Sequence, residues 1–297
     1  MTGFFDAYVM VDWSAAGTPR RGRDSIWYAI LLRDGSSQHV ADLRNPPTRA
    51  QATAELGDTF ARLLADGRRI LAGFDFPFGF PSGTAARLGL SGQPWRGLWQ
   101  TLSDSIEDAS DNANNRFDVA ERLNRDLSGE AFPFWGNVRE EKRQFLYRRG
   151  RRPHRPDDLA ERRLCDRRLR STQPVWKLAG IGSAGSQALT GIPRVWQLRC
   201  DPRLAFAAHL WPFETGLRID SRPSLVLAEI YPSLVDPEPI PPNPLDAAQV
   251  VAIARHLATL DHAEKMAEFF SGDPQLSTAE RQSVECEEGW ILGAVGP

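Results

Sequence analysis

Three apolar, β-prone runs in this chain each meet an acidic residue near their carboxyl end. The runs have the sequences AYVMVD (residues 7–12), RILAGFD (69–75) and SLVLAE (224–229). Period-two alternation in the first run places Val9 and Val11 on one face and Asp12 on the other. An ionised carboxylate is costly to bury, so the position of each acidic residue at the end of an apolar strand needs an explanation. One aspartate could simply cap the next turn, but three such cases favour a shared site.

The first run begins a unit of three antiparallel strands followed by a helix. Residues 25–33 are rich in β-branched, aromatic and aliphatic side chains, which predicts a second strand. Asp34-Gly35 is typical of a hairpin turn, and residues 39–43 would form a short third strand. Thr48 is the predicted N-cap of a helix that continues to Gly67. Its apolar face would consist of Leu56, Phe60, Leu63 and Leu64.

The run at residues 69–75 follows this helix, so we expect it to pair in parallel with the first strand. Pairing of that kind places Asp12 and Asp75 at the same carboxyl edge of the sheet. Open α/β sheets bind their ligands at this edge. The third run, which ends at Glu229 before Pro232, would bring a third carboxylate there.

The middle of the chain is predicted to be mainly helical, with helices at residues 95–109, 114–127 and 157–169. Its many Trp and Phe side chains favour a core over a base-stacking platform. Residues 139–170 hold 13 Lys and Arg against 6 Asp and Glu, whereas the whole chain has a net charge of −2. This asymmetry indicates either a solvated face of interleaved ion pairs or a phosphate-binding patch. The candidate phosphate contacts are Arg148, Arg149, Arg151, Arg152 and Arg155.

Residues 180–185 match the dinucleotide-binding pattern GxGxxG. The helix that follows is expected to end before Gly191-Ile192-Pro193. A helix of this length is too short for a βαβ crossover. We therefore expect a backbone nest for a phosphate or a tight packing turn. The candidate cofactor-binding residues are Gly180, Gly182, Ser183 and Gly185.

The end of the chain predicts two further helices. Asp246 would cap a long helix after the proline-rich residues 237–244, and another helix would begin after Ser277. Acidic residues then precede the apolar residues 290–292; they are Glu285, Glu287 and Glu288. One of these could add a fourth carboxylate to the shared site.

Clustered carboxylates without a histidine or cysteine pattern favour Mg²⁺ or Mn²⁺ over zinc. The three cysteines are far apart and show no CxxC spacing, which argues against a zinc site or a disulfide framework. Three or four carboxylates can hold two ions that clamp the attacking and leaving oxygens of a phosphodiester.

The motifs VDWS (11–14), GFDFPFGFP (73–81), AEIYP (228–232) and EGW (288–290) together resemble the DUF429 group of predicted nucleases. The resemblance implies a ribonuclease H-like α/β fold: a mixed five-stranded sheet of three antiparallel and then parallel strands, with a large helical insertion. Residues 1–81 and 224–297 would form the core, and residues 82–223 the insertion. It also implies that Asp12, Asp75 and Glu229 are metal ligands. The group more often has an aspartate before Ala-Leu where this chain has Glu288, so Glu285 and Glu287 remain alternatives for the last ligand.

The leading hypothesis is a Mg²⁺- or Mn²⁺-dependent nuclease or phosphohydrolase. Asp12 would bridge two ions, Asp75 and Glu229 would each hold one, and Glu288 would complete or gate the site. Its partner would be a nucleic acid or a small phosphoester. With no apolar run of 18 residues and no basic leader, we expect a cytoplasmic chain without a membrane span.

Two other hypotheses remain open. A sugar-kinase or actin-like ATP-binding protein shares a related fold, but that architecture needs two copies of the strand–helix unit. A non-catalytic protein could instead bind a nucleotide-like cofactor, such as a pterin dinucleotide, through residues 180–185. A degenerate nuclease fold kept as an interaction module belongs to the same non-catalytic class.

Overall fold

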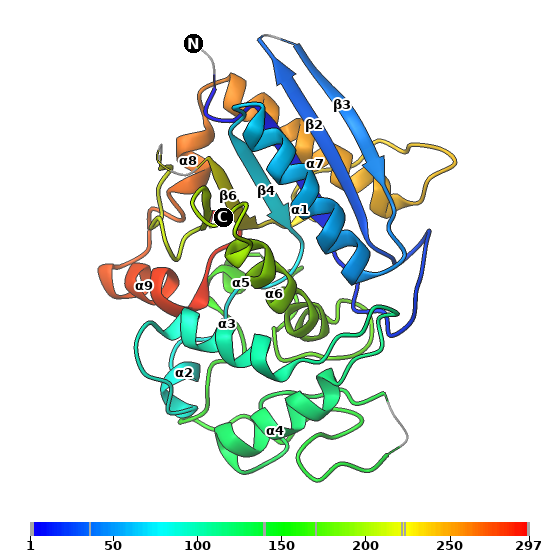
Figure 1. Cartoon of the computed structure of the whole chain (residues 1–297). Coiled ribbons are helices and arrows are strands. Elements are labelled where there is room, and N and C mark those ends of the chain that lie inside the picture. The colour runs from blue at the N-terminus through cyan, green and yellow to red at the C-terminus, as the bar shows by residue number, and fades with distance from the viewer. Residues whose placement is uncertain are drawn as a thin grey trace.

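The computed structural model describes residues 3–35, 37–138, 141–169, 171–220, 222 and 224–295. These residues form one mixed β-sheet with helices on both faces (Figure 1). The strands are β1 (Ala7–Asp12), β2 (Trp27–Asp34), β3 (Ser37–Arg44), β4 (Ile70–Phe74), β5 (Ala208–Leu210) and β6 (Leu225–Glu229). The α-helices are α1 (Arg49–Ala65), α2 (Thr84–Arg87), α3 (Pro94–Ser105), α4 (Arg116–Ser128), α5 (Leu164–Arg168), α6 (Ala184–Cys200), α7 (Leu245–His262), α8 (Met266–Phe270) and α9 (Thr278–Ser283). A 3₁₀ turn lies at Pro232–Leu234, and a π-helical turn at Val284–Glu288.

The sheet has the strand order β3-β2-β1-β4-β6-β5. The pairs β1–β2 and β2–β3 are antiparallel, whereas β4 runs parallel to both β1 and β6. This order of antiparallel and then parallel strands confirms the arrangement predicted from the sequence. The predicted number of five strands was wrong, because β5 adds a sixth, parallel to β6. Since β5 is only three residues long, it carries no detectable period-two pattern.

Helices α1 and α7 cover opposite faces of the sheet (Figure 1). Thr48 caps α1, as predicted, by accepting a hydrogen bond from the Gln51 N–H. On α1, Leu56, Phe60 and Leu63 are fully buried in the same cluster as the inward residues of β1. The opposite face of β1 packs against α7. Within the described residues, no helix combines the length and the apolar composition that crossing a bilayer requires.

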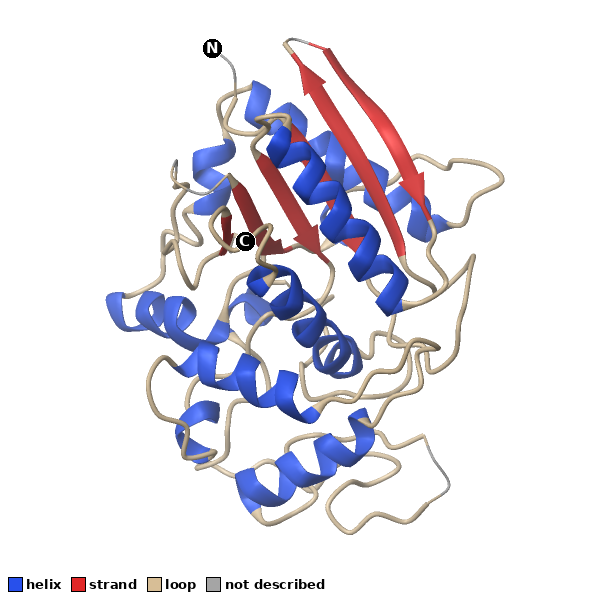
Figure 2. Ribbon diagram, viewed as in Figure 1, coloured by secondary structure: helices blue, strands red, loops and turns tan. Residues whose placement is uncertain are grey.

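The helices between β4 and β6 lie toward the end of the sheet at which the parallel strands terminate (Figure 2). The predicted helices at 95–109 and 114–127 correspond to α3 and α4. The prediction of a helix at 157–169 was mostly wrong, because only the short helix α5 forms there. Asp158 holds the preceding segment in a turn, since its carboxylate accepts from the Arg155 N–H at 2.6 Å. Such local side-chain bonds compete with helix formation.

Helix α6 also differs from the prediction, because it continues through Pro193 to Cys200. A proline inside a helix removes one backbone hydrogen bond. Here Leu189, Ile192 and Val195 are fully buried along the same helix, and their burial offsets that loss. Gly191 allows α6 to approach the Phe76 ring, where a Cβ atom would lie 2.5 Å from the nearest ring carbon.

The core on the α1 face continues from the sheet into the helical insertion. Trp95 and Trp99 of α3 and Phe117 of α4 belong to the same buried cluster as Phe74 and Phe78. The prediction that these aromatic side chains form core is confirmed. The insertion therefore shares apolar packing with the sheet.

Candidate functional site

Asp12 and Asp75 lie next to each other at the carboxyl edge of the sheet. Val11 of β1 is opposite Phe74 of β4, so the two aspartates follow residues that are paired in register. The backbone N–H of Asp75 donates to the carbonyl oxygen of Val11 at 2.9 Å. This parallel pairing brings the two carboxylates together, as expected from the sequence.

Each aspartate lines a cavity. The cavity around Asp75 has a volume of about 450 Å³, and the one around Asp12 a volume of about 500 Å³. Both cavities are lined by Ile181, Gly182, Gln187 and Gln249. Because they share these walls, the two cavities are neighbours at the carboxyl edge, and we call them together the Asp12–Asp75 cleft.

Both carboxyl groups are held in an environment that disfavours their ionised form. Burial, and then the negative charge of Glu229, raises the pKa of Asp75 to about 7. Burial also raises the pKa of Asp12, with further contributions from Asp75, Asp246 and Asp24. Among the described residues, neither carboxylate has a Lys, Arg or His ion-pair partner. A bound cation would relieve this repulsion.

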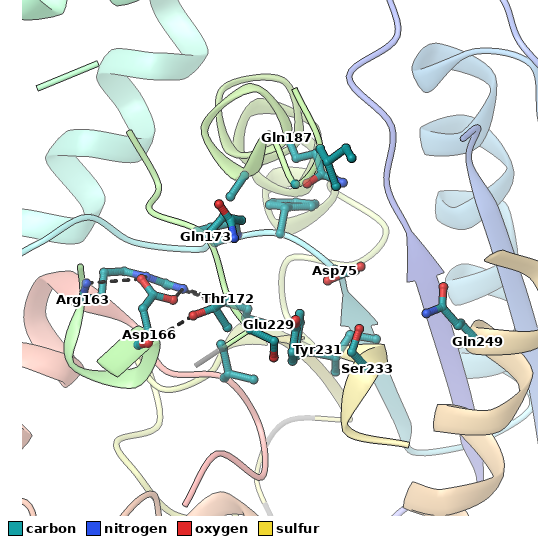
Figure 3. Close-up of a pocket in the computed structure, with 18 residues that line it drawn as sticks. Asp75, Arg163, Asp166, Thr172, Gln173, Gln187, Glu229, Tyr231, Ser233 and Gln249 are labelled. Atoms are coloured by element: carbon teal, nitrogen blue, oxygen red, sulfur yellow. Dashed lines mark hydrogen bonds and ion pairs between the residues drawn. The ribbon is translucent and has the colours of Figure 1, made fainter. Parts of the chain in front are cut away.

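Glu229, the third predicted ligand, already has a cationic partner. The buried guanidinium of Arg163 donates from Nη1 to Glu229 Oε2 at 2.7 Å and from Nη2 to Glu229 Oε1 at 2.6 Å. Arg163 also donates to both carboxylate oxygens of Asp166 and to the carbonyl oxygen of Glu288. Guanidinium has five N–H groups, and these five bonds use them all. Figure 3 shows Arg163 beside Asp166. Arg163 therefore neutralises Glu229 and has no N–H left for a ligand.

The acidic residues near the end of the chain hold backbone segments in place. Glu288 accepts from the N–H groups of Ser82 at 3.0 Å and Leu164 at 2.6 Å. Glu287 accepts from Gly83 and Ala85 at the start of α2, at 2.8 and 2.7 Å. Glu285 accepts from the Leu217 N–H at 2.8 Å. These three glutamates are absent from the described residues that line the cleft.

The described residues contain no group of three or more His, Cys, Asp or Glu side chains arranged to hold a metal ion. The donor set that fits a cation is the Asp12–Asp75 pair, since both groups are oxygen donors without a cationic partner. Mg²⁺ typically takes one or two protein carboxylates and completes its shell with water and phosphate oxygens. Two aspartates are sufficient for such a site.

The residues 180–185 form a tight packing turn that borders the cleft. Gly180 and Gly182 have φ values of 86° and 67°, which favour glycine. A Cβ atom at Gly185 would lie 2.3 Å from the carbonyl oxygen of Val175, so this position requires close backbone packing. Gly180 and Ser183 line the Asp12 side of the cleft, and Ile181 between them is 97% exposed.

The five candidate phosphate-binding arginines do not line the cleft. Three form ion pairs within the insertion: Arg151 with Glu161, Arg152 with Glu130 and Asp158, and Arg155 with Glu130. Arg148 and Arg149 are exposed. The residues at both ends of the basic stretch, 139 and 170, lie outside the described residues. The structure thus supports the interpretation of interleaved ion pairs for most of this stretch.

Sequence reasoning missed the polar side chains that line the cleft. Gln173, Gln187 and Gln249 come from separate segments of the chain, and Tyr231 and Ser233 both follow β6 (Figure 3). Arg163 was also missed, because it lies among many other arginines. The spacing Arg163-x-x-Asp166 was the available signal for a local ion pair.

Comparison with protein-family models, with curated proteins and with solved structures gives no match for this chain.

Proposed function

We propose that this chain is a Mg²⁺- or Mn²⁺-dependent phosphohydrolase that cleaves a phosphoester on a ribonuclease H-like sheet. The observation that carries the proposal is the Asp12–Asp75 pair, two half-buried carboxylates without a cationic partner at the carboxyl edge of neighbouring parallel strands. The strand order β3-β2-β1-β4-β6, with its change from antiparallel to parallel pairing, supports the ribonuclease H-like assignment. The resemblance to the DUF429 group has the same implication.

In this proposal Asp12 and Asp75 hold the ion, and Glu229 and Glu288 support the site. Glu229 keeps Arg163 in place and accepts from the Phe78 N–H at 2.9 Å, which fixes the loop after Asp75. Glu288 holds the segments at Ser82 and Leu164. A bound divalent ion supplies Lewis-acid polarisation of a phosphoryl oxygen and lowers the pKa of a coordinated water. Asp12 and Asp75 would position the ion.

The test is a calorimetric titration of Mn²⁺ into the full chain and into three variants. We expect Asp12→Asn and Asp75→Asn each to weaken Mn²⁺ binding by roughly tenfold or more, because each removes a charged oxygen donor. Glu285→Gln is the matched control, since Glu285 is an acidic residue outside the cleft, and it should bind Mn²⁺ as the wild type does. Equal Mn²⁺ affinity in all four proteins would contradict the proposed ligands.

Hydrolysis is then measured with bis(p-nitrophenyl) phosphate as a simple phosphodiester. We expect Mn²⁺-dependent release of nitrophenol by the wild type and by Glu285→Gln. Asp75→Asn should lose this activity. p-Nitrophenyl phosphate serves as the corresponding monoester. If Mn²⁺ binds at the two aspartates and neither the monoester nor the diester is cleaved, the chain binds a metal ion without phosphoester hydrolysis.

A further inference from the structure

We propose that the Asp12–Asp75 cleft takes a free nucleotide, a nucleoside phosphate, rather than a nucleic-acid chain. This inference names the substrate class of the proposed phosphohydrolase and rests on that proposed function. The charge of the cleft, its glutamines and one exposed apolar side chain support a nucleotide as the ligand.

The charge of the cleft disfavours a polymer of phosphates. The described residues that line it include six acidic and three basic side chains. The acidic residues are Asp12, Asp24, Asp75, Asp166, Asp246 and Glu229, and the basic residues are Arg20, Arg116 and Arg163. Arg163 uses all its N–H groups on protein acceptors. A nucleic-acid track neutralises many successive phosphates with Lys and Arg, so this cleft suits a ligand with few phosphates.

Two glutamines present a defined hydrogen-bonding pattern to the cleft. Gln187 Nε2 donates to the carbonyl oxygen of Trp13 at 2.7 Å, and Gln173 Oε1 accepts from Lys177 Nζ at 2.9 Å. A carbonyl oxygen only accepts and an ammonium only donates, so both amide orientations are fixed. Gln187 therefore keeps its carbonyl oxygen for a ligand, and Gln173 keeps its NH₂ group. An acceptor and a donor together match the edge of a nucleobase.

Further polar groups face the same space from other elements. Tyr231 and Ser233 follow β6, and Gln249 lies on α7 (Figure 3). Hydroxyl and amide groups of this kind fix the orientation of a small ligand in a cleft. The sugar and base of a nucleotide offer matching donors and acceptors.

Ile181 provides an apolar contact at the mouth of the cleft. It is 97% exposed and lines the cavities on both the Asp12 and the Asp75 side. Lys177 Nζ donates to the Ile181 carbonyl oxygen at 2.6 Å, which anchors the loop. A flat base would bury this side chain, and burying an isoleucine corresponds to roughly tenfold or more in affinity.

The experiment measures binding to the full chain with Mn²⁺ present, by calorimetry. The probes are the four 5′-mononucleotides AMP, GMP, CMP and UMP, ribose 5-phosphate, and a single-stranded oligonucleotide. We expect at least one mononucleotide to bind roughly tenfold more tightly than ribose 5-phosphate. Ile181→Ser should remove most of that difference and leave the affinity for ribose 5-phosphate unchanged.

Two matched controls separate the contact from a general effect on the fold. Phe206→Ser changes another exposed apolar residue, 80% exposed and outside the cleft, and should leave all affinities unchanged. Gln249→Ala should weaken mononucleotide binding several-fold, whereas Gln197→Ala, on α6 outside the cleft, should not.

Three results would overturn the proposal. The first is that ribose 5-phosphate binds as tightly as every mononucleotide. The second is that Ile181→Ser weakens the binding of ribose 5-phosphate and of the mononucleotides equally. The oligonucleotide could also bind more tightly than any mononucleotide, with an affinity that falls steeply with salt, which would identify a polymer site. The Mn²⁺ titration of the wild type and of Asp75→Asn tests the proposed metal site without any nucleotide. Failure of the nucleotide proposal is therefore distinguishable from failure of the proposed metal-dependent function.

Discussion

The carboxyl group of Asp75 is held where its protonated form is favoured, because burial and Glu229 raise its pKa to about 7. An unfolded aspartate has a pKa of about 3.9. Between these two values the folded chain binds the proton and the unfolded chain does not. Stability in metal-free buffer therefore falls as the pH rises through this window.

Asp75→Asn removes this penalty, since an amide does not ionise. We expect the variant and the wild type to have similar free energies of unfolding near pH 4. The variant should become more stable than the wild type as the pH approaches 8, by up to about 4 kcal/mol. Urea unfolding across this range, without divalent ions, measures the difference. A difference that does not change with pH would contradict the raised pKa.

Arg163 is the charge partner on which the buried carboxylates Asp166 and Glu229 depend. Arg163→Met should destabilise the fold by about 3–5 kcal/mol, because it leaves two buried acids without a cation. Glu229→Gln combined with Arg163→Met should cost less than the sum of the two single changes. A double-mutant cycle by urea denaturation measures this coupling.

The same Glu229→Gln variant separates a structural role from metal binding. We expect its Mn²⁺ affinity to stay within about twofold of the wild type, because Arg163 already neutralises Glu229. A large loss of Mn²⁺ affinity in a folded Glu229→Gln protein would restore Glu229 as a ligand.

At the scale of elements, the loop after β4 packs directly against the π-helical turn at Val284–Glu288. A Cβ atom at Gly79 would lie 2.3 Å from the carbonyl oxygens of both Glu287 and Glu288. Gly79→Ala should therefore destabilise the protein by about 3 kcal/mol, since backbone atoms must shift. Gly17→Ala is the matched control, because a Cβ there meets no atom within 4 Å. Thermal unfolding of both variants and of the wild type measures the loss of stability in each variant.

The elements that the sequence predicted best are those with strong periodicity and clear boundaries. The strand β1, the cap at Thr48 and the long helix α7 follow from local pattern and turn chemistry. The three errors have three different causes. β5 is too short to show a period, Asp158 holds a turn where a helix was expected, and α6 passes through Pro193 because tertiary burial outweighs the lost hydrogen bond.

The candidate site was predictable only where it depends on strand pairing. Asp12 and Asp75 could be placed together because each directly follows or ends a strand, and parallel strands share a carboxyl edge. The partner of Glu229 could not be predicted, because Arg163 is 66 residues away in the sequence and lies in an irregular segment. The glutamines of the cleft carry no sequence signal, since single polar residues in loops are ordinary.

At the scale of the whole molecule, the sheet and the helical insertion share one buried cluster. We therefore expect them to unfold together. Urea unfolding followed by tryptophan fluorescence and by far-ultraviolet circular dichroism should give coincident transitions. The insertion supplies many of the tryptophans, including Trp95 and Trp99, so a separate early fluorescence transition would show that it unfolds on its own.

The guanidinium of Arg163 is an internal counter-ion that is covalently part of the chain. A chelator such as EDTA would remove the proposed divalent ion from Asp12 and Asp75, but it cannot remove the charge that balances Glu229 and Asp166. The protein should therefore keep its native circular dichroism spectrum after chelation, and Mn²⁺ added back should find the cleft already formed. Loss of the ion would then be reversible, in contrast to small metal-dependent domains that unfold without their ion.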